Sequence, residues 1–189
     1  MMEALLQLGA AVDQTNDNGD TALLMTALED QLELVQALCA RGAAKSFEGS
    51  AIHSEFAEEL TPAILQWFQD TERWCSRLHH AAWLRESEVR QLLRDGADLH
   101  ASDGSGGPTP LDVIQADPAR ARLASCQLVL EAAKPWSPAT HCLFPDASRQ
   151  YALQLAFLVF ALRRDYHRHN IWWKLPWVDI LLPLLVRRH

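Results

Sequence analysis

The sequence predicts an all-α fold built from stacked helical pairs, and the first reason is a repeated helix ending. Gly9–Ala10 and Gly42–Ala43 stand 33 residues apart, and each pair follows an apolar stretch with helical spacing. A glycine in this place can adopt the left-handed backbone conformation that ends a helix. Because self-similarity at such a period is typical of repeat architectures, we expect a helical solenoid.

The stretch between these two endings predicts the helices of one pair. Asn16–Gly19 is a turn signal, and Thr21 is placed to cap the helix that follows. Leu34, Val35 and Leu38 recur at helical spacing. We therefore expect them to form the apolar face of the second helix.

Residues 16–43 resemble the ankyrin repeat, which combines a finger loop, a Thr-Pro-Leu-His helix start and a second helix that ends in Gly-Ala. Ala22 and Leu24 depart from this pattern, because proline and histidine are usual at their positions. The resemblance implies a protein-binding array whose contacts lie on finger loops and first helices. The matching residues are Asn16, Gly19, Thr21, Leu23, Ala27, Val35, Leu38, Gly42 and Ala43.

Two further copies of the pattern follow. The stretch 78–104 begins with Leu-His-His-Ala-Ala, and its second helix ends at Gly96–Ala97. The last copy starts at Thr109–Leu111, and residues 121–133 supply its second helix. We therefore expect the ankyrin-type array over residues 1–135.

Three parts of this array are irregular. Segment 44–77 lacks a Gly-Ala ending and the residues of a full finger loop, so it is interpreted as a degenerate repeat whose two helices lie within 50–74. The glycine-rich stretch 103–108 is interpreted as a lengthened finger loop, since no Lys-Ser/Thr follows it and no strand precedes it, as a phosphate-binding loop requires. The sequence also begins inside a repeat. Either it is a piece of a longer array, or residues 1–8 cap it.

Adjacent histidines at positions 79 and 80 are the first candidates for chemistry. The resemblance implies that His79 bonds to backbone at the turn between neighbouring repeats. His80 occupies the variable position next to it, where a side chain is expected to face a partner. Because the two side chains point to different sides of one helix, they cannot share a metal ion, which needs three or four converging ligands.

No other group of residues predicts catalysis or metal binding. His141–Cys142 and His167–His169 lack the i, i+4 spacing that places two imidazoles on one helix face. Glu58 and Glu59 are interpreted as a solvated surface, since adjacent carboxylates on a helix splay apart. The sequence therefore predicts a non-enzymatic protein with no catalytic residue, no metal site and no cofactor.

Residues 136–189 are expected to form a C-terminal helical region. One long helix is expected at about 146–166, and a second segment at 176–186 pairs with it on the end of the array. The apolar face of the long helix contains Tyr151, Leu155, Leu158, Val159 and Leu162.

The last residues of the chain resemble the opening of an F-box, with a Leu-Pro pair followed by spaced leucines. Pro183 departs from that pattern because it interrupts the helix. A SOCS box, which also follows ankyrin arrays, has a Leu-Pro element too. The F-box-like residues are Leu175, Pro176, Ile180, Leu181, Leu184 and Leu185.

This C-terminal region leaves three interpretations open. It caps the array, or it recruits a cullin-type ubiquitin ligase through a linker protein, as the F-box resemblance implies. Contact with a membrane surface through Trp172, Trp173 and Trp177 is the weakest of the three, because the long charged face of an interfacial helix is missing. The apolar runs 151–162 and 179–186 are shorter than the roughly 20 residues that cross a bilayer.

Charge limits the class of partner. Residues 1–162 hold 11 basic and 22 acidic side chains, whereas residues 163–189 hold 6 and 2. The acidic body argues against a nucleic-acid partner and favours basic or mixed-polarity proteins. The absence of a signal peptide and of a Cys-x-x-Cys pair predicts an intracellular protein, in the cytoplasm or alternatively the nucleus.

We therefore expect a protein–protein interaction module, and the alternative is a substrate adaptor of a cullin-type ubiquitin ligase. The identity of the partner protein does not follow from the sequence. The expected contact residues, on fingers and first helices of the concave face, are Gln14, Asp17, Met25, Glu29, His80, Trp83, His100 and Ser102.

Overall fold

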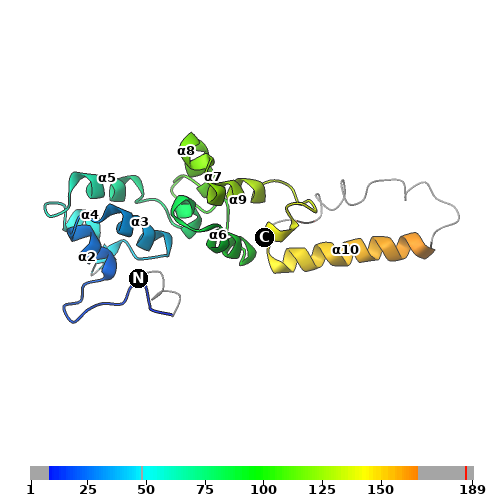
Figure 1. The fold of residues 1–189 in the computed structure, drawn as a ribbon, viewed down its shortest axis with the longest axis horizontal. Helices are drawn as coiled ribbons and strands as arrows, with labels where there is room; N and C mark the ends of the chain where they lie inside the picture. The colour runs from blue at the N-terminus through cyan, green and yellow to red at the C-terminus, as the bar shows by residue number, and fades with distance from the viewer. Residues whose placement is uncertain (1–8, 48, 166–185, 187–189) are drawn as a thin grey trace. The chain divides into compact units, whose positions relative to one another are not determined.

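The computed structural model describes residues 9–47, 49–165 and 186 of the chain, with residues 159–165 described by their backbone alone. The described part is mostly helical, with one short pair of antiparallel strands, which confirms the all-α class (Figure 1). The chain divides into two compact units, one made of Met1–Leu84 and His100–Pro118 and the other of Arg85–Leu99 and Ala119–His189.

The first unit begins with the predicted helical pair, α2 (Ala22–Leu28) and α3 (Leu32–Ala40). The Thr21 hydroxyl accepts a hydrogen bond from the Leu24 amide, so the predicted cap is confirmed. Gly42 follows α3 with a φ of +95°, which confirms the predicted left-handed ending.

Burial corrects one residue of the predicted apolar face of α3. Val35 and Leu38 are buried, but Leu34 is 37% exposed. The buried side of α3 contains Val35, Leu38 and Cys39, which share a core with Leu23 of α2. Leu34 precedes Val35 by a single residue, about 100° of helix, and it therefore turns away from that core.

Segment 44–77 forms the two predicted helices and also a hairpin that the sequence did not predict. The edge-to-face contact between the Phe47 and Phe56 rings, with centroids 5.5 Å apart, packs the hairpin against the turn after the first of these helices. The elements are β1 (Ser46–Phe47), β2 (Ser50–Ala51), α4 (Ile52–Glu55) and α5 (Pro62–Asp70).

The two ends of this segment lie next to each other. The Lys45 ammonium donates a hydrogen bond to the Thr71 carbonyl at 2.6 Å, and the Arg77 guanidinium donates one to the Ala40 carbonyl at 3.2 Å. A Cβ atom on Gly42 would lie 3.7 Å from the Arg77 side chain. The chain therefore leaves the end of α3 at residue 44 and returns to the same place at residue 77.

One apolar core joins this segment to α2 and α3. Its side chains come from both helices and from the segment, and the largest of them, Phe68, is fully buried. The core consists of Leu23, Leu24, Ala27, Val35, Leu38, Cys39, Ala43, Ile52, Leu60, Ile64 and Phe68.

Two more helices complete the first unit. The 3-10 helix η1 (Arg77–Trp83) packs against both α3 and α7 (Pro110–Ala116). The Thr109 hydroxyl accepts a hydrogen bond from the Asp112 amide, and the Asp112 carboxylate accepts one from the Thr109 amide. This reciprocal pair starts α7 at the residue that the Thr-Pro-Leu motif predicts. The short α8 (Pro118–Ala121) follows in sequence.

The second unit is helical over its described residues. Helix α6 (Glu86–Arg94) packs against α9 (Ala124–Ala132), and η2 (His141–Leu143) contacts both. The chain after α6 turns at Gly96, whose φ of +86° confirms a second predicted ending.

The longest described helix, α10 (Asp146–Asp165), matches the predicted helix at about 146–166. Its buried side includes Ala152, which packs with Trp136, Phe144 and Val186. Leu155 is partly buried, as predicted, but two residues of the predicted apolar face are exposed, Tyr151 at 46% and Leu158 at 54%.

The other residues of that face, Val159 and Leu162, have no described side chains, and the predicted segment 176–186 lies outside the described residues except for Val186. Among the helices that the structure describes, none is long and apolar enough to span a membrane.

Candidate partner-binding surface

The His79 side chain links two loops of the first unit from a buried position. It is 1% exposed, its Nε2 lies 2.9 Å from the Pro108 carbonyl oxygen, and its Nδ1 lies 2.9 Å from the Ser76 hydroxyl and 3.2 Å from the Ser76 amide. Because a carbonyl only accepts, Nε2 carries the proton and Nδ1 accepts from Ser76. The prediction that His79 bonds to backbone is confirmed, and that this bond joins neighbouring repeats stays a prediction.

The expectation that His80 faces a partner is wrong. Its side chain is 2% exposed and packs against the rings of Trp67, Trp74 and Trp83, with centroid distances of 5.9, 4.9 and 6.0 Å. The prediction rested on the position of His80 in the ankyrin pattern. The segment is instead the 3-10 helix η1, with non-helical dihedral angles at His80 (φ −95°, ψ 20°).

The residues Trp67, Trp74 and Trp83 form a tryptophan cluster around His80. The Trp67 and Trp83 rings meet edge to face with centroids 6.4 Å apart, and Trp74 lies 6.1 Å from Trp83. Each tryptophan residue is partly exposed to solvent. The Trp83 indole N–H donates to the Gln36 amide oxygen at 2.8 Å, which fixes the orientation of that ring.

A lysine lies against one ring of this cluster. The Lys45 ammonium is 5.4 Å from the centre of the Trp67 ring, a cation–π distance, and it also binds the Thr71 carbonyl. Burial lowers the pKa of Lys45 to about 8, and burial raises the pKa of the Cys39 thiol in the same region to about 12. The thiol therefore stays protonated at neutral pH.

Four of the predicted contact residues lie on the first finger and on α2. Gln14, Asp17, Met25 and Glu29 are all exposed, and Met25 is 45% exposed. The Asn16 amide donates to the Met25 sulfur at 3.7 Å, which holds the finger against α2. The structure therefore leaves these four side chains accessible, and their role in binding stays a prediction.

His100 and Ser102 are also exposed, and they lie in the loop that ends at Pro108. Trp83 is half-buried within the tryptophan cluster. The sequence reasoning missed Trp67 and Trp74 as partners of Trp83. The available signal was composition, because three of the seven tryptophans of the chain fall within residues 67–83.

The glycine-rich loop 103–108 wraps around a carboxylate of its own chain. The Asp103 carboxylate accepts hydrogen bonds from the Ser105 and Gly107 amides and from the Arg73 guanidinium. A Cβ atom on Gly107 would lie 2.8 Å from Asp103 Oδ1, so glycine is needed there. The amides that a phosphate would need already bind Asp103, which favours the predicted finger loop.

Stability in acid should depend on Asp103. The Arg73 guanidinium, followed by the Ser105 and Gly107 donors, holds the pKa of Asp103 well below its usual value of 3.8. Since the folded carboxyl binds protons less readily than the unfolded one, this stabilisation is present above about pH 4 and is lost as the pH falls further. Urea unfolding between about pH 5 and pH 2.5 should show a smaller decline for Asp103→Asn than for the wild type. Equal declines would contradict the assignment.

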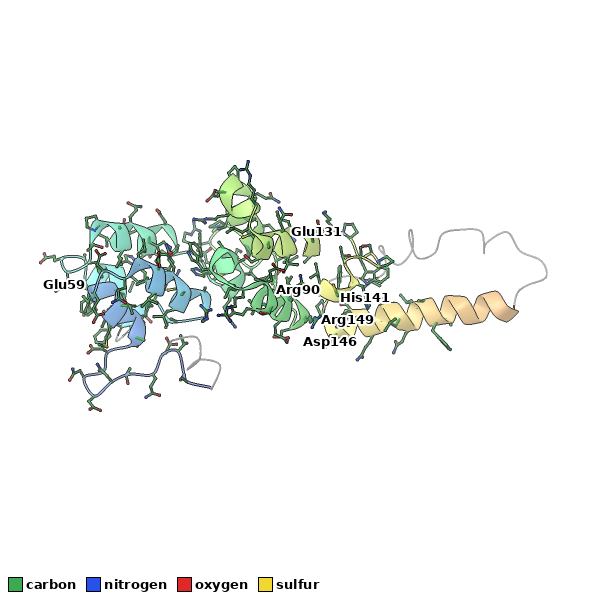
Figure 2. The ribbon with its side chains drawn as sticks, viewed as in Figure 1. Glu59, Arg90, Glu131, His141, Asp146 and Arg149 are labelled. Carbon is green, nitrogen blue, oxygen red and sulfur yellow. The ribbon has the colours of Figure 1, made fainter. Side chains whose placement is uncertain are left out.

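The remaining candidates are surface or internal groups. Glu58 and Glu59 are exposed, as predicted, but they lie in a turn before α5 rather than on a helix, and Glu59 points away from the helices (Figure 2). No three His, Cys, Asp or Glu side chains of the described residues are grouped to hold a metal ion.

His141 is held in its neutral form by its surroundings in the second unit. Its Nδ1 accepts a hydrogen bond from the Trp136 indole at 3.1 Å. Burial, together with the Arg149 charge beside it, lowers the pKa of His141 (Figure 2). A neutral imidazole bonded to an indole is a packing interaction of this unit.

The F-box-like residues lie outside the part of the chain that the structure describes, and so do His167–His169 and the tail tryptophans. Ligase recruitment therefore stays a prediction. The residues concerned are Leu175, Pro176, Ile180, Leu181, Leu184 and Leu185. In comparisons with known proteins, no family model, curated protein or solved structure matches the chain.

Proposed function

We propose that the protein is a non-enzymatic protein–protein interaction module, an ankyrin-type helical solenoid that binds a partner protein through its fingers and first helices. The observation that carries this proposal is the bond from His79 to the Pro108 carbonyl. Pro108 immediately precedes Thr109–Leu111, the start of the next copy of the motif. On this proposal one repeat is tied to the residue just before its neighbour, which is the role that the ankyrin resemblance assigns to this histidine.

Matching helix signals at separate places in the chain support the same proposal. Thr21 and Thr109 cap helices of seven residues, and the second helices α3, α6 and α9 have nine residues each. Gly42 and Gly96 turn the chain after two of these second helices with positive φ. Recurring helix caps, helix lengths and glycine endings are expected where similar units stack on one another.

Site-specific photo-crosslinking tests the proposed function. A photoreactive amino acid placed at Gln14, Glu29 or Ser102 should link the same partner protein in cells, because these exposed positions lie on the proposed binding elements. Glu59 is the matched control, since it is equally exposed but lies in the turn before α5. The proposal fails if all four positions give no product, or if Glu59 gives as much product as the others.

A further inference from the structure

We propose that the tryptophan cluster, together with the neighbouring carboxylates Asp70 and Glu72, is the docking surface for an arginine-rich segment of the partner. This inference rests on the proposed function and names the chemistry of the partner. The proposed docking surface lies entirely within the first unit.

The tryptophans supply the contact area. Tryptophan is the residue most enriched among those that dominate binding energy at interfaces, where a rigid ring is partly exposed before binding and covered afterwards. Trp67, Trp74 and Trp83 brace one another around the buried His80 ring, and Gln36 fixes Trp83 by a hydrogen bond. The rings are therefore ordered before a partner arrives, which reduces the entropy that binding costs.

A cation already rests on this cluster from within the chain. The Lys45 ammonium lies over the Trp67 ring and is also held by a carbonyl. Tryptophan is the aromatic side chain that binds cations best, and guanidinium groups stack on it more often than ammonium groups do. Trp74 and Trp83 are partly exposed as well, and indole rings bind the cation of a partner by the same interaction.

The charge of the first unit selects a basic partner. Its sequence contains 4 basic and 16 acidic side chains. All four basic groups donate hydrogen bonds within the protein: Arg41 to the Ala37 carbonyl, Lys45 to the Thr71 carbonyl, Arg73 to the Asp103 carboxylate and Arg77 to the Ala40 carbonyl. The exposed carboxylates thus dominate the surface field, which attracts a basic segment.

Two of these carboxylates are neighbours of the tryptophans in the sequence, and Glu72 also lies 4.0 Å from the His53 imidazole. Asp70 ends α5 three residues after Trp67, which places both on the same side of the helix. Glu72 precedes Trp74 by two residues, and its side chain is 62% exposed. A guanidinium stacked on an indole here can reach a carboxylate at the same time, and this combination distinguishes arginine from an apolar contact.

Isothermal titration calorimetry tests the inference. The whole chain is titrated with a synthetic peptide of repeated Arg-Gly pairs at about 0.1 M ionic strength. The wild type should bind this peptide and not a peptide of repeated Glu-Gly pairs. Trp74→Leu should weaken binding about fivefold, and Trp74→Phe less, because phenylalanine keeps a weaker cation–π surface. Unchanged far-ultraviolet circular dichroism shows that each variant folds.

A pair of double variants separates binding at this surface from general attraction of the peptide to an acidic protein. These variants leave the tryptophans unchanged. Asp70→Asn/Glu72→Gln and Glu58→Gln/Glu59→Gln each remove two negative charges at exposed positions. The first should weaken binding several-fold more than the second. Equal effects, or no binding by the wild type, overturn the inference. Crosslinking at Gln14, Glu29 and Ser102 tests the proposed function separately, so the two failures are distinguishable.

Discussion

Phe68→Ala should lower the free energy of unfolding by about 3–5 kcal/mol, the largest loss expected from a single substitution in this chain. The Phe68 ring is 0% exposed and belongs to the core that joins α5 to α2 and α3. It also meets the Trp67 ring edge to face with centroids 5.4 Å apart. Alanine removes the buried ring and leaves a cavity that the surrounding helices fill only in part. Urea unfolding followed by circular dichroism measures the loss.

Gln69→Ala is the matched control for this measurement. Gln69 is the next residue of α5 and is exposed, so its replacement should change stability by less than about 0.5 kcal/mol. A loss below about 1 kcal/mol for Phe68→Ala would mean that the segment 44–77 does not share a core with α2 and α3.

Features set by residues close together in the chain could be predicted from the sequence. Thr21 and Thr109 start their helices because a hydroxyl reaches an amide only three residues away. Gly42 and Gly96 could be predicted as helix endings because the left-handed conformation depends only on the φ angle of the glycine itself. The bounds of α10 were predicted almost to the residue, since a long apolar helical pattern needs no knowledge of what it packs against.

Features set by distant residues could not be predicted in this way. The segment 44–77 closes on itself through a bond between Lys45 and Thr71, 26 positions apart. Leu34 fits the helical spacing as well as Val35 does, but only the position of the neighbouring helix decides which of them is buried. The spacing of apolar residues predicts that the helix has a buried face. Which residues lie at the centre of that face depends on the tertiary packing.

The candidate binding surface likewise has parts that the local sequence predicts and parts that depend on distant residues. The exposure of Gln14 and Glu29 follows from their place in a loop and at a helix end. The tryptophan cluster instead requires α5, the turn after it and η1 to meet, and Trp83 is oriented by Gln36, 47 positions earlier. His80, predicted at the surface, is instead buried among these tryptophans.

His79→Ala is the second substitution with a large expected effect, a loss of about 1–3 kcal/mol in the free energy of unfolding. The imidazole is 1% exposed and bonds on one side to Ser76 and on the other to the Pro108 carbonyl, 29 positions away. Alanine leaves the Pro108 carbonyl without this donor and the Ser76 amide without this acceptor. Urea unfolding of the variant at neutral pH measures the loss.

The neighbouring residues give this prediction its controls. Cys75→Ala, at an exposed side chain one residue before Ser76, should be nearly silent. Ser76→Ala removes one of the two partners, so a double variant of Ser76 and His79 should lose less than the sum of the single losses, since both changes break the same bond. Additive losses would show that the bond between His79 and the Ser76 hydroxyl does not stabilise the fold. A silent His79→Ala would contradict the prediction, and the Pro108 bond would then no longer support stacked repeats.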